Sequence, residues 1–339
     1  FERSHENYFF SIDTIGYQNI AIQGNEQWEY VYPRIEYNVS DIKDDFFKGN
    51  ITLNNQLDFN KTLDHSYTTL ASSQINWHKN NTDNNTGLTF ENRANFRLVS
   101  ISIDNKNTND TDNVRLYPQL HTIISYPLIK SGANFIQTLT PKIMPIIAPY
   151  NNYTGAQDIS SSNLFSSNRA TSITQWESGP RVNYGVDWFL GNNNDFNMSL
   201  TVGQSFRINK NDSDRTEELS DYYFSSNLGI KNNYLSSSIV LDRNDIDVKS
   251  ISMNTYSEIY DLKFKLDYDY TSGKYSSADE QVAIGGQYNF QKNFYLKFTG
   301  TKDIDTNKNI GYQYGLLYED NCLGIDLNYY RDLTIDRDI

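Results

Sequence analysis

Long stretches of this sequence alternate strictly between apolar and polar residues. The clearest stretch, residues 262–270, reads Leu-Lys-Phe-Lys-Leu-Asp-Tyr-Asp-Tyr, and similar alternation runs through residues 182–190, 196–202 and 310–316. A period of two places successive side chains on opposite faces of a β-strand, whereas a helix needs a period near 3.6. Helical periodicity is nearly absent. The chain is therefore predicted to be all-β and antiparallel, with one apolar and one polar face on each strand.

The predicted strands are too long for an ordinary soluble sheet. They commonly extend over about 9–14 residues, whereas soluble strands average about 5–6 and a tilted membrane strand needs about 9–11. The connections also sort by length, with short turns near residues 231–233 and 319–321 and long loops over 209–220 and 271–281. Short turns at one end and long loops at the other are typical of outer-membrane barrels. We therefore expect an antiparallel transmembrane β-barrel with lipid outside and an aqueous lumen.

The composition narrows the function classes. Lys and Arg total 29 and Asp and Glu total 42, so the formal net charge is −13. A chain this acidic is a poor partner for nucleic acid, which requires Lys and Arg to neutralise phosphates. The 26 Tyr residues suit the aromatic girdles that barrels place at the membrane–water boundary.

The strand count indicates that the barrel is present only in part. Counting alternating stretches yields about 17 strands. Bacterial single-chain barrels have an even number, and they close because lipid cannot satisfy unpaired backbone groups. We expect residues 1–339 to be a single outer-membrane β-barrel domain fragment.

Two segments break the alternation. Five of the seven prolines fall within residues 118–149, which predicts a bent strand pair near loops; a deliberately weakened stretch of wall is the alternative. Residues 150–180 are rich in Ser and Asn and are expected to form the largest surface loop.

Residues with catalytic potential do not gather in any known pattern. The four histidines are scattered, and the sequence contains no nucleophile elbow, P-loop or dinucleotide fingerprint. We therefore expect no enzyme activity, no cofactor and no metal site. The better candidates are charged residues predicted to face the lumen, where they could contact a saccharide or a plug protein or simply keep water inside. These are Lys263, Lys265, Asp267, Asp269, Arg207 and Lys297.

Several ordered motifs resemble one family. They include Leu-Tyr-Pro-Gln-Leu at 116–120, Asn-Leu-Phe at 163–165, Asn-Arg at 168–169, Glu-Ser-Gly at 177–179, Arg-Val-Asn-Tyr-Gly at 181–185 and Tyr-Glu-Asp-Asn-Cys-Leu at 318–323. This set resembles the lipopolysaccharide-assembly proteins of the outer membrane, the LptD family, also called OstA or Imp. The matches span most of residues 114–339, and residues 1–113 match only in barrel character.

The resemblance implies a function and partners. Members of this family insert lipopolysaccharide into the outer leaflet of the cell outer membrane through a barrel of about 26 strands. A periplasmic jelly-roll domain receives the lipid from an LptA-like periplasmic bridge, and an LptE-like lipoprotein plug sits in the lumen. The lipid leaves between the first and last strands. On this basis the present chain would supply roughly strands 9 to 25, without the jelly-roll domain, the early strands and the last strand.

Cys322 is the one cysteine, so it has no partner for a disulfide within the chain. It follows the predicted turn 319–321, and the outward alternation of Leu323 and Ile325 makes it face inward at the periplasmic end. In the family, cysteines at this place form disulfides to the N-terminal domain in the oxidising periplasm. Many relatives carry two adjacent cysteines, whereas Asn321 is the neighbour here. A buried free thiol is the alternative.

Two other functions remain open at the level of sequence. A general diffusion porin or ligand-gated outer-membrane transporter would close within its own chain and end on an aromatic residue. A secreted β-structured adhesin would bury its apolar face between two sheets.

Overall fold

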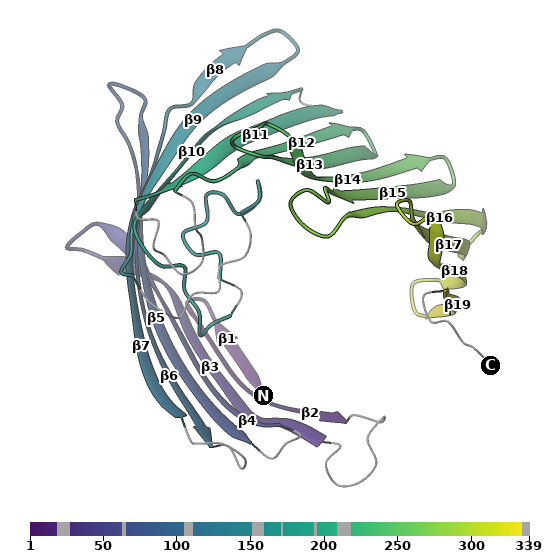
Figure 1. Cartoon of the computed structure of the whole chain (residues 1–339). Coiled ribbons are helices and arrows are strands. Elements are labelled where there is room, and N and C mark those ends of the chain that lie inside the picture. The colour runs from purple at the N-terminus through teal and green to yellow at the C-terminus, as the bar shows by residue number, and fades with distance from the viewer. Residues whose placement is uncertain are drawn as a thin grey trace.

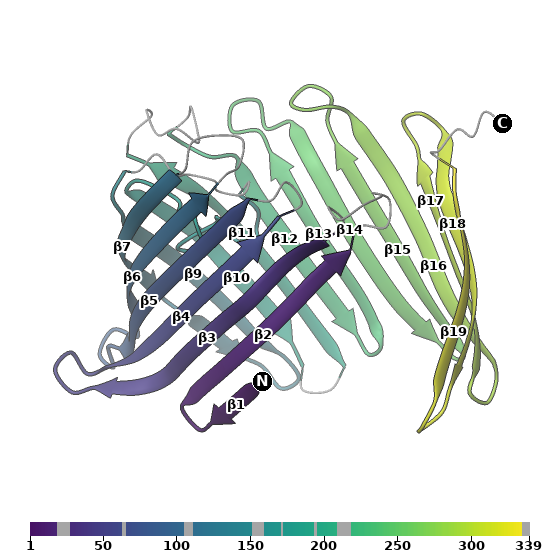
Figure 2. The same ribbon diagram turned by 90° about the horizontal axis from the view of Figure 1, so that it is seen from below.

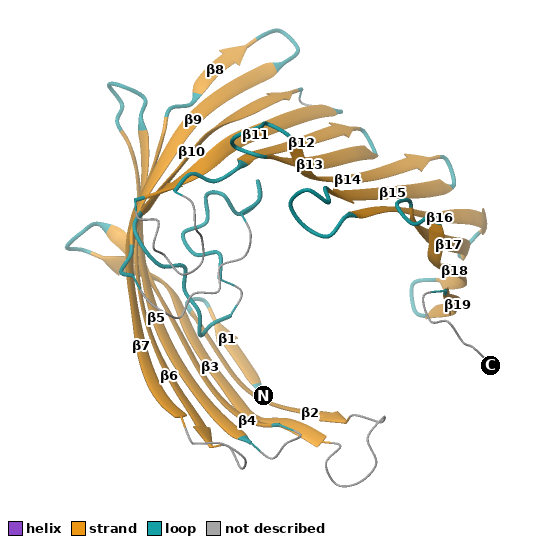
Figure 3. Cartoon of the chain, viewed as in Figure 1, coloured by secondary structure: helices purple, strands orange, loops and turns teal. Residues whose placement is uncertain are grey.

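The computed structural model describes residues 1–18, 28–62, 66–104, 111–150, 159–170, 172–192, 195–208 and 218–333. Within these ranges the chain forms strands and loops only (Figure 3). Across the same ranges, no helix has the length and apolar character needed to cross a membrane.

The described residues form nineteen strands. They are β1 (Glu2–His5), β2 (Tyr8–Gln18), β3 (Trp28–Asp44), β4 (Gly49–Lys61), β5 (Tyr67–Thr82), β6 (Thr89–Asp104), β7 (Thr111–Ser125), β8 (Leu128–Ser131), β9 (Ile136–Ile147), β10 (Arg181–Gly191), β11 (Phe196–Arg207), β12 (Tyr222–Ile230), β13 (Asn233–Leu241), β14 (Val248–Ile259), β15 (Leu262–Thr271), β16 (Asp279–Gln291), β17 (Phe294–Asp303), β18 (Lys308–Glu319) and β19 (Gly324–Asp332).

The strands form one curved sheet in which neighbours in the chain pair antiparallel, as between β5 and β6 or β10 and β11. The sheet curls into an open C shape (Figure 1), and its strands lie side by side with a common tilt (Figure 2). Among the paired residues that the structure describes, none joins β1 or β2 to β19. The fold is therefore an open, partial β-barrel, which confirms the predicted fold class.

The structure has 19 strands where the sequence predicted about 17. Two of these strands, β1 and β8, contain only 4 residues each. Every other strand extends over 9 to 17 residues, which is at least the length that a tilted membrane strand requires.

The proline-rich region lies at β7, β8 and β9. Residues 120–121 pair with 146–147 and residues 124–125 pair with 142–143, and the ladder skips the two positions between them, opposite Pro145. β8 continues the same register after a break at Pro127. Proline has no N–H to donate, so each of these positions costs a ladder hydrogen bond. The prolines therefore interrupt the hydrogen-bond ladder between β9 and the pair β7 and β8. These two elements share one register and together form one broken strand.

Connection lengths differ between the two ends of the sheet. One end carries short turns such as 231–232, 260–261 and 292–293, and the other carries the connections 148–180 and 208–221. The connection 304–307 is short although it belongs to the second end.

On the outer face of the sheet, the apolar side chains of the described strands have no second layer to pack against. On β15, Leu262 and Phe264 alternate with Lys263 and Lys265, and Leu262 remains 38% exposed. On β19, Leu327 is 63% exposed. In a soluble protein such a surface would be buried, whereas lipid covers it in a membrane barrel. A single sheet with an uncovered apolar face does not provide the two-layer core that a secreted adhesin would need.

Candidate functional site on the inner face of the sheet

The described part of the connection between β9 and β10 folds onto the concave side of the sheet, which we call the inner face (Figure 1). For the described residues 159–170 and 172–180, this corrects the prediction that residues 150–180 form a surface loop. We name its described residues 159–170 and 172–180 the inner loop. The loop is largely polar, yet Ile159, Leu164 and Trp176 are 5%, 0% and 2% exposed. These apolar side chains anchor the inner loop on the wall, because burying each of them stabilises the folded state by about 1.5–3 kcal/mol.

Trp176 anchors one end of the inner loop. Its ring stacks on Tyr117 of β7 at 5.8 Å between centroids, and the Arg97 guanidinium lies 4.7 Å from the ring centroid. The same buried cluster contains Leu70, Val99 and Ile101 from β5 and β6. Inner-face positions that would be polar in a water-filled lumen are thus apolar where the loop covers them.

Leu164 anchors the other end. It packs with Ile159 and with Tyr223 of β12. Gly203 of β11 leaves the space that Leu164 needs, because a Cβ on this glycine would lie 2.5 Å from Leu164 Cδ2. The Asn-Leu-Phe motif at 163–165 therefore has a packing role on the inner face.

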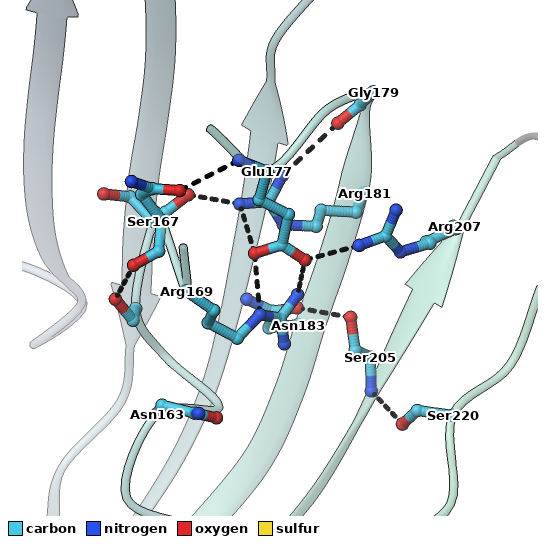
Figure 4. Close-up of polar contacts among 12 residues, drawn as sticks. Asn163, Ser167, Arg169, Glu177, Gly179, Arg181, Asn183, Ser205, Arg207 and Ser220 are labelled. Carbon is cyan, nitrogen blue, oxygen red and sulfur yellow. Dashed lines mark hydrogen bonds and ion pairs between the residues drawn. The ribbon is translucent and has the colours of Figure 1, made fainter. Parts of the chain in front are cut away.

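Glu177 lies at the centre of a buried ion cluster (Figure 4). Its carboxylate accepts a hydrogen bond of 2.7 Å from Arg169 Nε and lies 3.2 Å from Arg181 Nη2. Arg207 Nη2 donates to the other carboxylate oxygen, Oε1. The side chains of all four residues are 0–4% exposed. We call these four residues the Glu177 cluster; it joins the inner loop to β10 and β11.

The charges of the Glu177 cluster do not balance. Burial by itself raises the pKa of Glu177, but Arg181, Arg169 and Arg207 together outweigh burial and lower that pKa to about 2. The carboxylate is therefore ionised at neutral pH. A single buried carboxylate faces three guanidinium groups, so removing it would take away a negative charge that all three share.

Backbone carbonyls of the inner loop accept further hydrogen bonds from the wall. Ser167 O accepts from Gln119 Nε2 at 2.6 Å and from Arg181 Nη2. Thr174 O accepts from Arg115 Nη1 at 2.8 Å and from the Tyr117 hydroxyl at 2.9 Å. The loop thus binds β7 on one side and β10 and β11 on the other. It spans β9, where the prolines interrupt the ladder.

The six predicted lumen-facing residues do not form one site. Arg207 belongs to the Glu177 cluster. The strand registers place the other five on the same face as Arg207, but they lie on β15 and β17, several strands away. Lys265 forms an ion pair with Asp267 at 2.7 Å. Lys263 and Asp269 lie on the same face of β15.

Lys297 forms an ion pair with Asp326 at 2.6 Å, from β17 to β19. Gly315 of the intervening strand leaves room for this contact, because a Cβ there would meet Lys297 Cε at 3.0 Å and Asn328 Oδ1 at 2.4 Å. The lumen-facing role of all six residues stays a prediction.

Sequence reasoning did not select Glu177, Arg169 and Arg181 as site residues. They were visible only as parts of the motifs at 168–169, 177–179 and 181–185. A signal was present, since charged residues within a Ser/Asn-rich loop that also holds Trp176 and Leu164 indicate a segment with a buried face.

Cys322 lies in the turn 320–323 between β18 and β19, where it is free and exposed. The sequence had placed it at the start of a strand, inside the barrel. The turn is longer than predicted because Asp320 Oδ1 accepts hydrogen bonds of 2.8 Å from the N–H groups of both Cys322 and Leu323. Strand alternation therefore does not determine the direction of the thiol.

Known proteins resemble this chain in sequence family and in strand arrangement. The family model described as "LptD: LPS transport system D" matches residues 4–296. Two solved structures of mutants of a porin from Rh. blastica are also similar. A mutant with five substitutions has a TM-score of 0.33 and 12% identity over 84% of this chain and 95% of that chain. A mutant with two substitutions has a TM-score of 0.29 and 8% identity over 95% of this chain and 100% of that chain. No curated protein matches in sequence.

Proposed function

Because this chain belongs to the family of LPS transport system D, we propose that it transports lipopolysaccharide across the outer membrane and inserts it into the outer leaflet. The observation that carries the proposal is the family match over residues 4–296 of a chain that folds as an open β-barrel wall.

The two faces of the wall suit an amphiphilic substrate. The saccharide of lipopolysaccharide requires a hydrated path, and the inner face offers charged and amide side chains. The acyl chains require hydrocarbon, which surrounds the apolar outer face. Transport of this kind needs no bond to be made or broken in the barrel, and its energy comes from outside the outer membrane, which lacks ATP.

We propose the partners on the same basis. An LptE-like lipoprotein plug would occupy the concave side that remains open beside the inner loop. An LptA-like periplasmic bridge would deliver lipopolysaccharide through a jelly-roll domain at the periplasmic end. Further strands would complete the wall, because the open edges of the sheet would leave backbone groups unpaired in lipid. The protein would then reside in the cell outer membrane as part of a larger barrel.

Cys322 is proposed to form a disulfide with the N-terminal domain, and its exposed position in a turn supports this. We expect Cys322→Ser to change the mobility of the full-length protein on a non-reducing gel and to leave it unchanged on a reducing gel. Equal mobility of the variant and the wild-type protein on the non-reducing gel would remove the disulfide.

Depletion of the protein in cells tests the function. We expect newly made lipopolysaccharide to disappear from the cell surface, as measured by labelling intact cells, while total lipopolysaccharide persists inside. Re-expression of the wild-type protein should restore the label. Normal surface labelling after depletion would end the proposal and favour a porin or ligand-gated transporter.

A further inference from the structure

A polar cavity of about 550 Å³ lies where the inner loop meets β4, β5 and β6. The wall contributes side chains from three neighbouring strands, and the inner loop contributes Ser167, Asn168 and Trp176. The volume falls within the range of sites for small ligands, about 300–1,000 Å³. Because the loop forms one side, the cavity exists only while the loop is docked.

Amide groups make up much of the cavity wall, and hydrogen bonds hold them in place. Gln74 Nε2 donates to Asn76 Oδ1 at 2.6 Å, and Asn95 Nδ2 donates to Gln119 Oε1 at 3.3 Å. Asn168 Oδ1 accepts the N–H of Glu177 at 2.9 Å, which links the cavity to the Glu177 cluster. Amides both donate and accept, so a set of positioned amides matches the hydroxyl groups of a sugar ring.

The cavity is also basic. Its lining includes Arg93, Arg97 and His78, and no acidic residue is among the residues that line it. Arg97 is held by a hydrogen bond of 2.9 Å from Nε to Gln74 Oε1 and by its contact with the Trp176 ring. Arg93 forms an ion pair with Glu91, which is not among the lining residues, and keeps 52% of its side chain exposed. A basic recess within a chain of net charge −13 favours an anionic ligand.

We propose that this cavity binds an anionic sugar unit of the lipopolysaccharide in transit. The amides form hydrogen bonds with the hydroxyl groups of the sugar. Arg93 and Arg97 form ion pairs with the phosphate or carboxylate that the sugar carries. The inference rests on the proposed function, and it adds a binding site for the saccharide on the inner face.

Binding of a defined probe tests the proposal. The full-length protein, purified in detergent, is titrated with the phosphorylated core oligosaccharide obtained by complete deacylation of lipopolysaccharide, and heat is measured by calorimetry. The same oligosaccharide after removal of its phosphates and inorganic phosphate alone are the comparison ligands. We expect the phosphorylated oligosaccharide to bind at least tenfold more tightly than either.

Two variants locate the binding. We expect Arg93→Gln and Asn76→Ala each to weaken binding about tenfold or more, because each removes a group that contacts the ligand. Arg331→Gln removes the same charge on β19, far from the cavity, and is expected to leave binding unchanged. Arg93 is half exposed, so its replacement leaves the fold intact, and a heat-modifiable band on a gel verifies the folded barrel for every variant.

The outcomes separate the cavity from the function. Three results would each overturn the cavity proposal. They are an equal loss of affinity in Arg93→Gln and Arg331→Gln, inorganic phosphate binding as tightly as the phosphorylated oligosaccharide, and no binding of the oligosaccharide. Loss of surface lipopolysaccharide on depletion would then still support the transport function. If depletion left surface lipopolysaccharide normal while the oligosaccharide bound and Arg93→Gln abolished binding, the proposed function would fail and the cavity would remain a saccharide site.

Discussion

Replacing Glu177 by Gln is expected to lower the free energy of unfolding by about 3–5 kcal/mol, the usual loss when one partner of a buried ion cluster is removed. The Gln side chain keeps the shape of Glu177 but removes the negative charge that the buried Arg169, Arg181 and Arg207 share. Urea unfolding of the protein in lipid vesicles, followed by tryptophan fluorescence, measures the change. Added protease should also cut the inner loop faster.

Two further variants show whether charge is the cause. Asp326→Asn breaks the Lys297 pair, whose side chains are 24% and 43% exposed, and should cost about 1 kcal/mol or less. Adding Arg169→Gln to Glu177→Gln removes the cation that binds Glu177 through both Nε and Nη2 and should recover part of the lost stability. If Glu177→Gln costs no more than Asp326→Asn, or if the double variant is less stable than Glu177→Gln alone, the ion cluster does not hold the loop.

Replacing Trp176 by Ala is expected to cost about 3–5 kcal/mol, the range for removing a large aromatic side chain from a packed site. Trp176 is 2% exposed and joins the inner loop to Tyr117 and Arg97 through its ring. The same vesicle unfolding assay measures the loss, with Tyr fluorescence as a probe that does not depend on the deleted ring.

Trp176→Phe is the matched variant. It keeps an aromatic ring beside Tyr117, and the indole N–H that it removes has no hydrogen-bond partner among the described residues. Its cost should therefore be clearly smaller than that of Trp176→Ala. Equal losses for the two variants would mean that ring stacking does not anchor the loop.

The strands of this protein follow from local chemistry. Alternation such as Leu262-Lys263-Phe264 determines which side chains of a strand lie on the same face of the sheet. Paired residues of neighbouring strands point to the same face, so the pairing register extends this pattern across the sheet. The sequence therefore predicted the fold class and the polar and apolar faces of β15. Strands as short as β1 and β8 are not predictable in this way, because 4 residues are too few to show a period.

The inner loop could not be read in the same way. Residues 159–180 have no repeating pattern, and their Ser and Asn content is equally typical of a surface loop. Their position depends on wall residues distant in the chain, such as Tyr117, Gly203 and Arg207, which become neighbours only when the sheet curls. Glu177 and Arg207 are 30 residues apart, and no spacing rule joins them.

By itself, the sequence determined that this chain forms long antiparallel strands with one apolar and one polar face, and its motifs indicated the family. The reason is that strand alternation and turn length are properties of short segments. Only the tertiary structure shows that the inner loop docks on the inner face of the wall. It also shows that three arginines contact Glu177 and that a basic cavity lies beside β4, β5 and β6. Each of these depends on the curvature of the whole sheet, which brings distant side chains into contact.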